Sequence, residues 1–393
     1  MNWKYRNSTL APLVTLRRTL HSQPDPSGQE ADTAARIRDF LLTCRPEFIE
    51  EELGGHGLAA GFVAPGEQPG PTVVLRAELD ALPIRETGRV DHVSCRSGVA
   101  HLCGHDGHMA LLCGVALGLR DRPPVRGRII LLFQPAEETG QGARAIAADP
   151  RWRIWAPDRV FALHNLPGQP LGQVLLREGP FTAGSIGLVI NLSGHTSHAA
   201  HPEKGCSPAA AMSRLVTGLV TLPIQLEARG DLALVTVVHA RLGEEDFGTS
   251  PGQASILATL RADQYDVLKE LRHLATAMAE HESAADGLDC RLEWVEEFPL
   301  TINHPAAVDE ARRATVRAGL DHGMPPESPF RWSEDFGWLS ADVPGALIGL
   351  GAGENQPDLH ASDYDFPDEL LAPGLRFWEA LLVELGLRPT VDQ

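Results

Sequence analysis

The chain has 393 residues, of which 43% are hydrophobic and 22% charged, and its formal net charge is −18. The length accommodates two domains with a large core, and the composition is ordinary for a soluble globular protein. The negative charge argues against DNA or RNA as a partner, because binding a polyanion requires clustered Lys and Arg. No apolar stretch is long enough to span a membrane, and the N-terminal segment is too polar for a signal peptide. The six cysteines show no paired spacing, so we expect a cytoplasmic protein with reduced thiols.

The first part of the chain alternates between strand and helix patterns. Helices are expected at about Leu10–His21, at Met109–Leu119 and at Ala31–Leu42, where Ser27 and Glu30 have the spacing of a capping box. Short apolar runs predict strands at Leu58–Val63, Thr72–Ala77, Arg128–Phe133, Val160–His164 and Gln173–Leu176. Strands that alternate with helices in this way indicate a layered α/β domain.

A different pattern begins near Gly179. Strands and helices are expected in the order strand, helix, strand, strand, helix, strand, at Gly184–Ser193, Ser207–Leu226, Leu232–Arg241, Ala254–Ala262, Asp266–Glu282 and Leu288–Glu297. That order is the split βαβ pattern of a ferredoxin-like α+β unit. We therefore predict a domain of residues 183–299 inserted into a domain made of residues 1–182 and 300–393. The chain should then return to the sheet of the outer domain with a strand at Ala346–Leu350. It should end with a helix within Phe366–Leu385.

The segment His101–His108, with the sequence HLCGHDGH, concentrates three histidines, a cysteine and an aspartate. Thiolate, imidazole and carboxylate groups are the ligands of a borderline-soft divalent metal such as zinc. Gly104 and Gly107 allow the backbone to turn sharply and approach an ion closely. The segment lies between a predicted strand and a predicted helix, where α/β proteins place their chemistry. The alternative is a chance cluster on a solvated loop.

Glu137 and Glu138 come directly after the predicted strand Arg128–Phe133 and the residues Gln-Pro-Ala. Adjacent side chains on extended backbone point to opposite sides, so one carboxylate could bind a metal while the other faces a bound water. Ligand and general base are the two roles that a metal-dependent hydrolase needs. The alternative is a solvated turn with two acidic residues.

Several other histidines stand at informative places in the chain. His164 ends a predicted strand, where it is either a ligand or a capped surface residue. His360 precedes three aspartates and is equally compatible with a ligand and a surface loop. His195 and His198 fall at the end of the first strand of the inserted domain. They could reach a substrate only if that domain closes over the site.

Seven ordered motifs carry a resemblance to a known family, and the resemblance covers about Leu13 to Leu385. They are Arg76–Ile84 (RAELDALPI), His101–His108, Gln134–Glu138 (QPAEE), His164–Asn165, Thr196–Ala200 (TSHAA), Ser333–Phe336 (SEDF), and Leu359–His360 with Tyr364–Phe366. With these motifs the chain resembles the metal-dependent amidohydrolases of the aminoacylase and carboxypeptidase type of metallopeptidase. The nearest branch is the hippurate hydrolases and indoleacetyl-amino-acid hydrolases.

The resemblance implies a catalytic domain that carries a dinuclear metal centre and an inserted ferredoxin-like lid and dimerisation domain. It implies five metal ligands, namely Cys103, His105, Glu138, His164 and His360. Glu137 would be the general base, and His198 would stabilise the oxyanion, either in its own subunit or in a partner. Asp80 would orient a ligand. Two departures from the family pattern, Glu78 in place of the frequent Asp and Ala361 in place of Asn, touch none of the expected ligands.

These expectations describe a hydrolase that binds two divalent ions per subunit, drawn from zinc, manganese, cobalt and nickel. Its substrate would be an N-acyl amino acid, and its own assembly a homodimer or larger homo-oligomer. A dipeptidase or aminopeptidase with the same metal centre is the nearer alternative, and a non-catalytic metal-binding scaffold is the farther one. Arg241 and Arg261 could hold a substrate carboxylate, although an exposed, salt-bridged arginine is the more ordinary interpretation of each.

Overall fold

The computed structural model describes residues 7–226, 232–324 and 327–389, which form two compact units. Unit 2 consists of Thr182–Leu300 and Pro329–Glu334, and unit 1 contains the rest. The chain leaves unit 1 after the short strand β7 (Gly179–Thr182) and returns to it at β14 (Thr301–Asn303). These two strands pair with each other, so both ends of the long inserted segment meet at one place.

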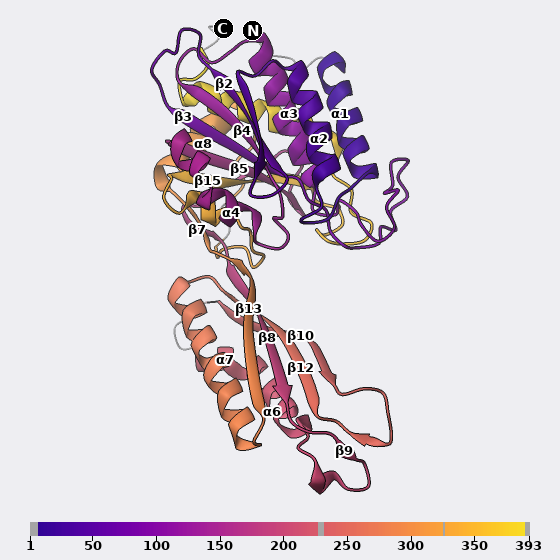
Figure 1. The fold of residues 1–393 in the computed structure, drawn as a ribbon. Coiled ribbons are helices and arrows are strands. Elements are labelled where there is room, and N and C mark those ends of the chain that lie inside the picture. Colours follow the sequence, from indigo (N-terminus) through magenta and orange to yellow (C-terminus); the bar gives the residue numbers. More distant parts are fainter. Residues whose placement is uncertain (1–6, 227–231, 325–326, 390–393) are drawn as a thin grey trace. The chain divides into compact units, whose positions relative to one another are not determined.

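Unit 1 is built on a seven-stranded sheet with the order β1-β2-β4-β3-β5-β15-β6 (Figure 1). Its strands are β1 (Phe48–Leu53), β2 (Gly57–Val63), β3 (Thr72–Glu78), β4 (Arg128–Gln134), β5 (Arg159–Pro167), β6 (Val174–Leu175) and β15 (Gly345–Gly353). The neighbours β4, β3, β5 and β15 run parallel, whereas β1, β2 and β6 are antiparallel to the strands beside them. The parallel strands are buried almost throughout, which accounts for their continuous apolar runs.

Helices cover this sheet and supply most of the remaining core of unit 1. Helices α1 (Asn7–Ser22), α2 (Ala31–Thr43) and α3 (His105–Asp121) lie side by side along one face (Figure 1). Helix α10 (Leu371–Glu384) packs on α3 and on α8 (Pro305–Ala318), which contacts β15. The shorter helices are α4 (Gly142–Ala148), α5 (Pro150–Trp155), α9 (Gly337–Ser340) and the 3₁₀ turn η4 (Asp368–Leu370). The central helix α3 is buried on nearly every side, so the residues at its N-terminus are held firmly.

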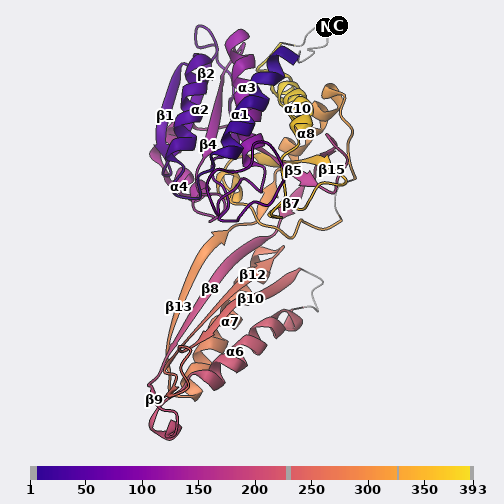
Figure 2. The ribbon, with the colours of Figure 1, turned by 90° about the vertical axis from the view of Figure 1, so that its right-hand side faces the viewer.

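Unit 2 has a four-stranded antiparallel sheet with the order β10-β12-β8-β13. Its strands are β8 (Gly184–Ser193), β10 (Ala233–Leu242), β12 (Gln253–Ala262) and β13 (Asp289–Phe298). Helices α6 (Ala209–Thr221) and α7 (Tyr265–Ala285) pack on one face of this sheet and on each other (Figure 2). A small ribbon, β9 (Ser197–His198) with β11 (Thr249–Ser250), and two 3₁₀ turns, η1 (Pro202–Lys204) and η2 (Leu222–Gln225), complete it. The order of its elements along the chain, β8-α6-β10-β12-α7-β13, is the ferredoxin-like pattern expected from the sequence.

The mixed α/β fold class is thus confirmed, while some local expectations are wrong. The capping box before α2 does not form, because Ser27 Oγ donates to Asp80 Oδ2 (2.7 Å) and Glu30 makes no side-chain cap. Helix α8 was not expected, although Pro305 at its start and Gly319 at its end are typical helix boundaries. None of the described helices is long and apolar enough to cross a bilayer.

Candidate metal centre

The segment rich in histidine spans the end of a loop and the first turn of α3. Helix α3 begins at His105 and not at Met109, so Cys103 ends the loop and His105 opens the helix. Between them Gly104 has a φ of 94°, in the left-handed region that favours glycine. A Cβ at this position would lie 2.5 Å from Asn165 Oδ1, so the close approach of the neighbouring strand also requires glycine.

Cys103, His105 and His164 form the buried part of the site. Cys103 Sγ lies 3.6 Å from His164 Nε2, and the ligand atoms of all three residues lie within 4.8 Å of one another. His164 belongs to β5, in the parallel part of the sheet, while the other two residues lie at the N-terminus of α3. The end of a parallel strand and the start of a helix therefore meet here, as is usual at α/β active sites.

Glu137 and Glu138 lie on a turn after β4, so the expectation of extended backbone with opposed side chains is wrong. Ala136 precedes them with a φ of 50°, which turns the chain back toward α3. Both carboxylates consequently approach one imidazole, because His105 Nε2 lies 3.7 Å from Glu137 Oε2 and 3.9 Å from Glu138 Oε1. The other oxygen of Glu138, Oε2, lies 3.6 Å from His360 Nε2, so this carboxylate spans two histidines.

The carboxylates of two acidic residues accept hydrogen bonds from the backbone of this turn. Asp80 Oδ2 accepts from the backbone N–H of Glu138 (2.9 Å), and Glu30 Oε1 accepts from that of Ala136 (2.9 Å). The backbone carbonyl of Asp80 also accepts from His105 Nδ1 (2.8 Å), so Asp80 touches both halves of the site. Burial raises the pKa of the Glu30 carboxyl. The sequence suggested Glu30 only as part of a capping box, because nothing local marks its contact with Ala136.

His360 approaches from a loop near the C-terminus. Its backbone N–H donates to Leu102 O (2.9 Å), which ties the loop to the residue before Cys103. Its side chain is 49% exposed, yet desolvation and the nearby His105 ring lower the pKa of His360 to about 4. The neutral ring at ordinary pH is the form that binds a metal. The ligand atoms of His360, Glu138 and Cys103 form a second group within 4.8 Å of one another.

The donor atoms fit a metal of zinc type in both chemistry and spacing. Bond lengths of zinc to nitrogen and sulfur place tetrahedral ligand atoms about 3.3–3.7 Å apart, close to the separations given above. His105 and His164 donate from Nδ1 to backbone carbonyls, at 2.8 and 2.9 Å, so in the neutral form of each ring the lone pair lies on Nε2. Among the residues that the structure describes, no group forms a hydrogen bond with the buried His105 Nε2. An unpaired lone pair at this depth is what a bound cation would satisfy.

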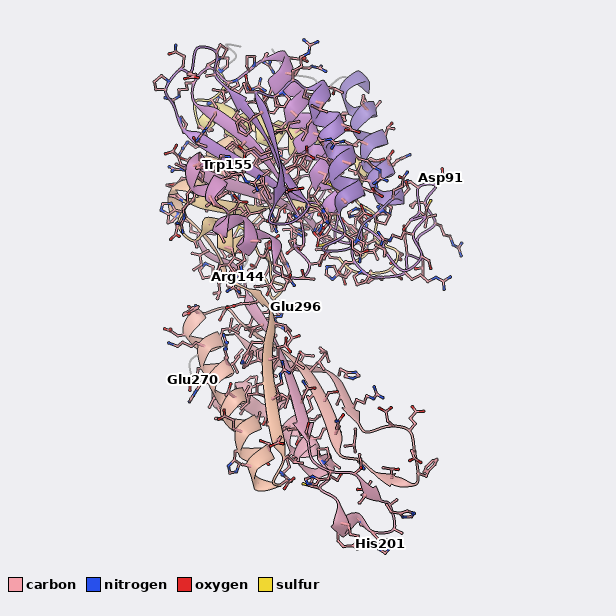
Figure 3. All side chains as sticks on the ribbon, in the orientation of Figure 1. Asp91, Arg144, Trp155, His201, Glu270 and Glu296 are labelled. Carbon is pink, nitrogen blue, oxygen red and sulfur yellow. The ribbon has the colours of Figure 1, made fainter. Side chains whose placement is uncertain are left out.

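The other residues that the sequence singled out lie in unit 2. His198 is in β9, and its Nδ1 accepts from the backbone N–H of Ala200 (3.0 Å). Its ring centroid lies 6.2 Å from that of His201, which Figure 3 shows at one end of this unit. Arg241 is paired with the exposed Glu244, as the more ordinary interpretation expected. Arg261, in contrast, donates to Ser333 Oγ (2.6 Å), and burial lowers its pKa.

A buried charged network lies behind the first turn of α3, and sequence patterns did not reveal it. Asp106 Oδ2 lies 3.0 Å from His21 Nδ1 and accepts from Arg17 (3.3 Å). The other ring nitrogen of His21 lies 3.1 Å from Glu86 Oε1. Burial alone would lower the pKa of His21, but the hydrogen bonds to Asp106 and Glu86 outweigh it and raise the pKa to about 10. His21 and Arg17 therefore anchor, with their positive charges, the helix turn that carries His105.

The raised pKa of His21 predicts a stability that falls in alkaline solution. The folded protein keeps a proton that the unfolded chain releases above about pH 6.5, so this contribution is complete below that pH and is lost as the pH rises to about 10. The contribution is on the order of 5 kcal/mol. His21→Gln should be less stable at pH 7 and should lose less stability than the wild type between pH 7 and pH 10. Thermal unfolding of the metal-free proteins measures this, with His281→Gln as an exposed control. Parallel pH profiles for His21→Gln and the wild type would contradict the prediction.

Comparison with known proteins shows which family the chain belongs to. The sequence model of peptidase family M20/M25/M40 matches residues 74–384. The chain belongs to this family. Family M20/M25/M40 consists of hydrolases, and the present chain is one of them. It resembles two proteins of Bacillus subtilis (strain 168), each named as an N-acetylcysteine deacetylase. One is 28% identical over 94% of this chain and 96% of its own length, and the other 32% identical over 86% and 80%.

Two solved structures share the fold over nearly all of the chain. A Bacillus subtilis protein described as a dinuclear metal-binding peptidase of family M20 has a TM-score of 0.77 and 26% identity, covering 96% of this chain and 98% of its own. A putative aminohydrolase from methicillin-resistant Staphylococcus aureus has a TM-score of 0.83 at 24% identity, covering 97% of each chain. At this identity the likeness supports a shared fold and nothing about function. The family predicted from the ordered motifs is therefore confirmed.

Proposed function

We propose that this M20 hydrolase cleaves the amide bond of N-acyl amino acids, releasing a carboxylic acid and a free amino acid. The observation that carries the proposal is the position of Glu137, whose carboxylate lies 3.7 Å from His105 Nε2 at the edge of a set of candidate metal ligands. The two similar deacetylases of Bacillus subtilis act, by name, on one N-acyl amino acid. We place the enzyme in the cytoplasm, as a homodimer or larger homo-oligomer.

Five side chains would hold two divalent ions of zinc, manganese, cobalt or nickel. They fall into two overlapping groups, Cys103 with His105 and His164, and Cys103 with Glu138 and His360. The two oxygens of Glu138 face different histidines, Oε1 toward His105 and Oε2 toward His360, so this carboxylate would help to hold both ions. Asp80 positions this set, because it holds both His105 and the backbone of Glu138.

Divalent ions, when bound, supply Lewis acidity, which lowers the pKa of water toward about 7 and polarises an amide carbonyl. Glu137 accepts the proton of the attacking water at its carboxylate and later delivers it to the leaving amine nitrogen. Its neighbours suit this role, because the turn held by Glu30 and Asp80 keeps the carboxylate beside the ligands instead of in bulk water. His198 donates a hydrogen bond to the oxyanion of the tetrahedral intermediate once substrate is enclosed.

The role of His198 predicts a loss of turnover without a loss of metal. His198→Ala should lower kcat by about 10²-fold or more, the usual effect of removing one oxyanion donor. Metal content should be unchanged, because none of the proposed ligands is altered. His201→Ala, which removes the neighbouring ring, is the matched control. A kcat close to that of the wild type, or a closed complex with a substrate analogue in which His198 is remote from the ions, would exclude this role.

The proposal as a whole is tested by an activity screen on defined metal forms. The chelated, metal-free protein and the protein reloaded with each of the four metals are offered N-acyl amino acids and dipeptides side by side. Hydrolysis of acyl amino acids that is abolished by chelation and restored by metal supports the proposal. Preference for dipeptides would assign the same centre to a peptidase. Full activity of the metal-free protein would refute the metal-dependent mechanism.

A further inference from the structure

Asn165 follows the proposed ligand His164 in the second half of β5, and its side chain is completely buried. Its Oδ1 lies 2.5 Å from His108 Nε2, and its Nδ2 donates to Tyr364 Oη (2.5 Å). His108 and Tyr364 are also fully or almost fully buried. All three residues belong to the motifs that carry the family resemblance, yet none of them has been given a chemical role above.

The backbone of Asn165 orients one proposed ligand directly. Its carbonyl oxygen accepts from His164 Nδ1 (2.9 Å), which directs Nε2 of His164 toward Cys103 Sγ at 3.6 Å. The side chain of Asn165 also packs against Gly104, the residue after Cys103, where no Cβ could be accommodated. A shift of Asn165 would therefore change the distance between His164 and Cys103.

Tyr364 connects the same asparagine to a second proposed ligand. Its backbone N–H donates to Ala361 O (3.0 Å), which makes a turn in the loop that begins at His360. The hydroxyl at the other end of Tyr364 is bonded to Asn165. The loop of His360 is thus tied at two points, to Leu102 through its backbone and to Asn165 through Tyr364.

The far end of this chain of hydrogen bonds is held by ion pairs inside the sheet. His108 Nδ1 lies 2.7 Å from Glu78 Oε2, and Glu78 is paired with Arg76. Arg76 in turn donates to Asp335 (2.8 Å). Burial alone would raise the pKa of Glu78, but Arg76 and His108 lower it well below its usual range. The carboxylate is therefore a fixed acceptor that prevents the His108 ring from turning.

We infer that Asn165 is a positioning residue for the metal centre. Through His108 and Tyr364 it sets the spacing of three proposed ligands, Cys103, His164 and His360, which come from three distant segments of the chain. The inference rests on the proposed metal-dependent function. Such outer hydrogen bonds control metal affinity, and their loss typically weakens it by about 10- to 100-fold.

Two variants remove parts of this network. Tyr364→Phe deletes one oxygen atom and keeps the ring, and Asn165→Leu keeps the approximate volume but removes both side-chain hydrogen bonds. Thr315→Val is the control, because it deletes a buried hydroxyl that donates within its own helix, to Ala311 O (2.8 Å). For each protein, the dissociation constants of Zn²⁺ and Co²⁺, the visible absorption of the Co²⁺ form and the thermal unfolding of the metal-free form are measured.

We expect Tyr364→Phe and Asn165→Leu to bind Zn²⁺ about 10- to 100-fold more weakly than the wild type. Their Co²⁺ spectra should also change, because the ligand geometry is altered, whereas a residue that only stabilised the fold would leave the spectrum intact. Wild-type affinity and an unchanged spectrum in Tyr364→Phe would overturn the inference, even if Asn165→Leu failed to fold. If these variants match a wild type that binds metal and hydrolyses its substrate, only this inference fails. A wild type that binds no metal would refute the proposed function as well.

Discussion

Glu137→Gln is expected to lower kcat by about two to four orders of magnitude, the usual contribution of a positioned general base. The amide has the size of the carboxylate but cannot accept the proton of the attacking water. Both metal ions should stay bound, because Glu137 is not among the five proposed ligands. Mass spectrometry of the metal content, performed beside steady-state kinetics, checks both halves of the expectation.

The neighbouring Glu138→Gln is the matched comparison, since it makes the same chemical change one residue later on the same turn. Glu138 presents its two oxygens to His105 and His360, so the amide should weaken metal binding. Its activity should return in part at high metal concentration. Metal loss in Glu137→Gln with retention in Glu138→Gln would reverse the two assignments. Retention of metal and activity in both variants would reduce the pair to a solvated turn.

Cys103→Ser is the second change expected to have a large effect. A thiolate binds soft and borderline metals far better than a hydroxyl, which stays protonated at neutral pH. The affinity for the metal ions should therefore fall by more than the roughly 10- to 100-fold that follows loss of an outer hydrogen bond. Hydrolysis at limiting metal concentration should fall with it. Competition with a chelator of known affinity measures the change.

Cys113→Ser is the control for Cys103→Ser, because Cys113 is also buried and lies on α3, the helix that follows Cys103. Cys113→Ser also places a hydroxyl at a buried site, with the loss of stability that this brings, but it changes none of the proposed metal ligands. Equal losses of metal in the two variants would mean that the effect comes from the fold of α3. Wild-type metal affinity in Cys103→Ser would remove the thiolate from the ligand set.

The fold was predictable where burial alone dictates the pattern. Strands β3, β4 and β5 lie between layers of other elements, so their apolar runs are unambiguous in the sequence. Helix α8 was missed because its buried stripe is made mostly of small residues, which give a weak apolar pattern: Ala307, Val308, Ala311, Ala314 and Thr315. Its boundary signals, Pro305 and Gly319, were present and could have located it.

Local patterns failed where a side chain has a distant partner. Ser27 and Glu30 have capping-box spacing, but they bind Asp80 and the backbone of Ala136, more than fifty residues away. Asp25 instead accepts from the backbone N–H of Thr33 in the first turn of α2 (2.9 Å). The relation of Glu137 to Glu138 was misjudged for a similar reason, because the positive φ of Ala136 leaves no local signature.

In the candidate site, too, local patterns identify some residues and leave others ambiguous. The residue types of the metal-binding set are informative at Cys103 and His105, which are close in sequence. His164 and His360 were ambiguous as isolated residues, and only the motifs of a family distinguished them. The structure brings their side chains together with Cys103 and Glu138, which depends on contacts between segments that no local pattern describes.

The position of β15 has a consequence for synthesis of the protein on the ribosome. In the sheet of unit 1, β15 lies between β5 and β6, although it is made long after both of them. During synthesis the edge of β5 that pairs with β15 therefore has no β15 partner until all strands and helices of unit 2 have left the ribosome. Unit 2 can assemble first, since its main elements are contiguous in the chain, and His360 leaves the ribosome only after β15. The complete ligand set is therefore available to a metal only late in synthesis. A chain that stops before Gly345 leaves the edge of β5 open to other chains.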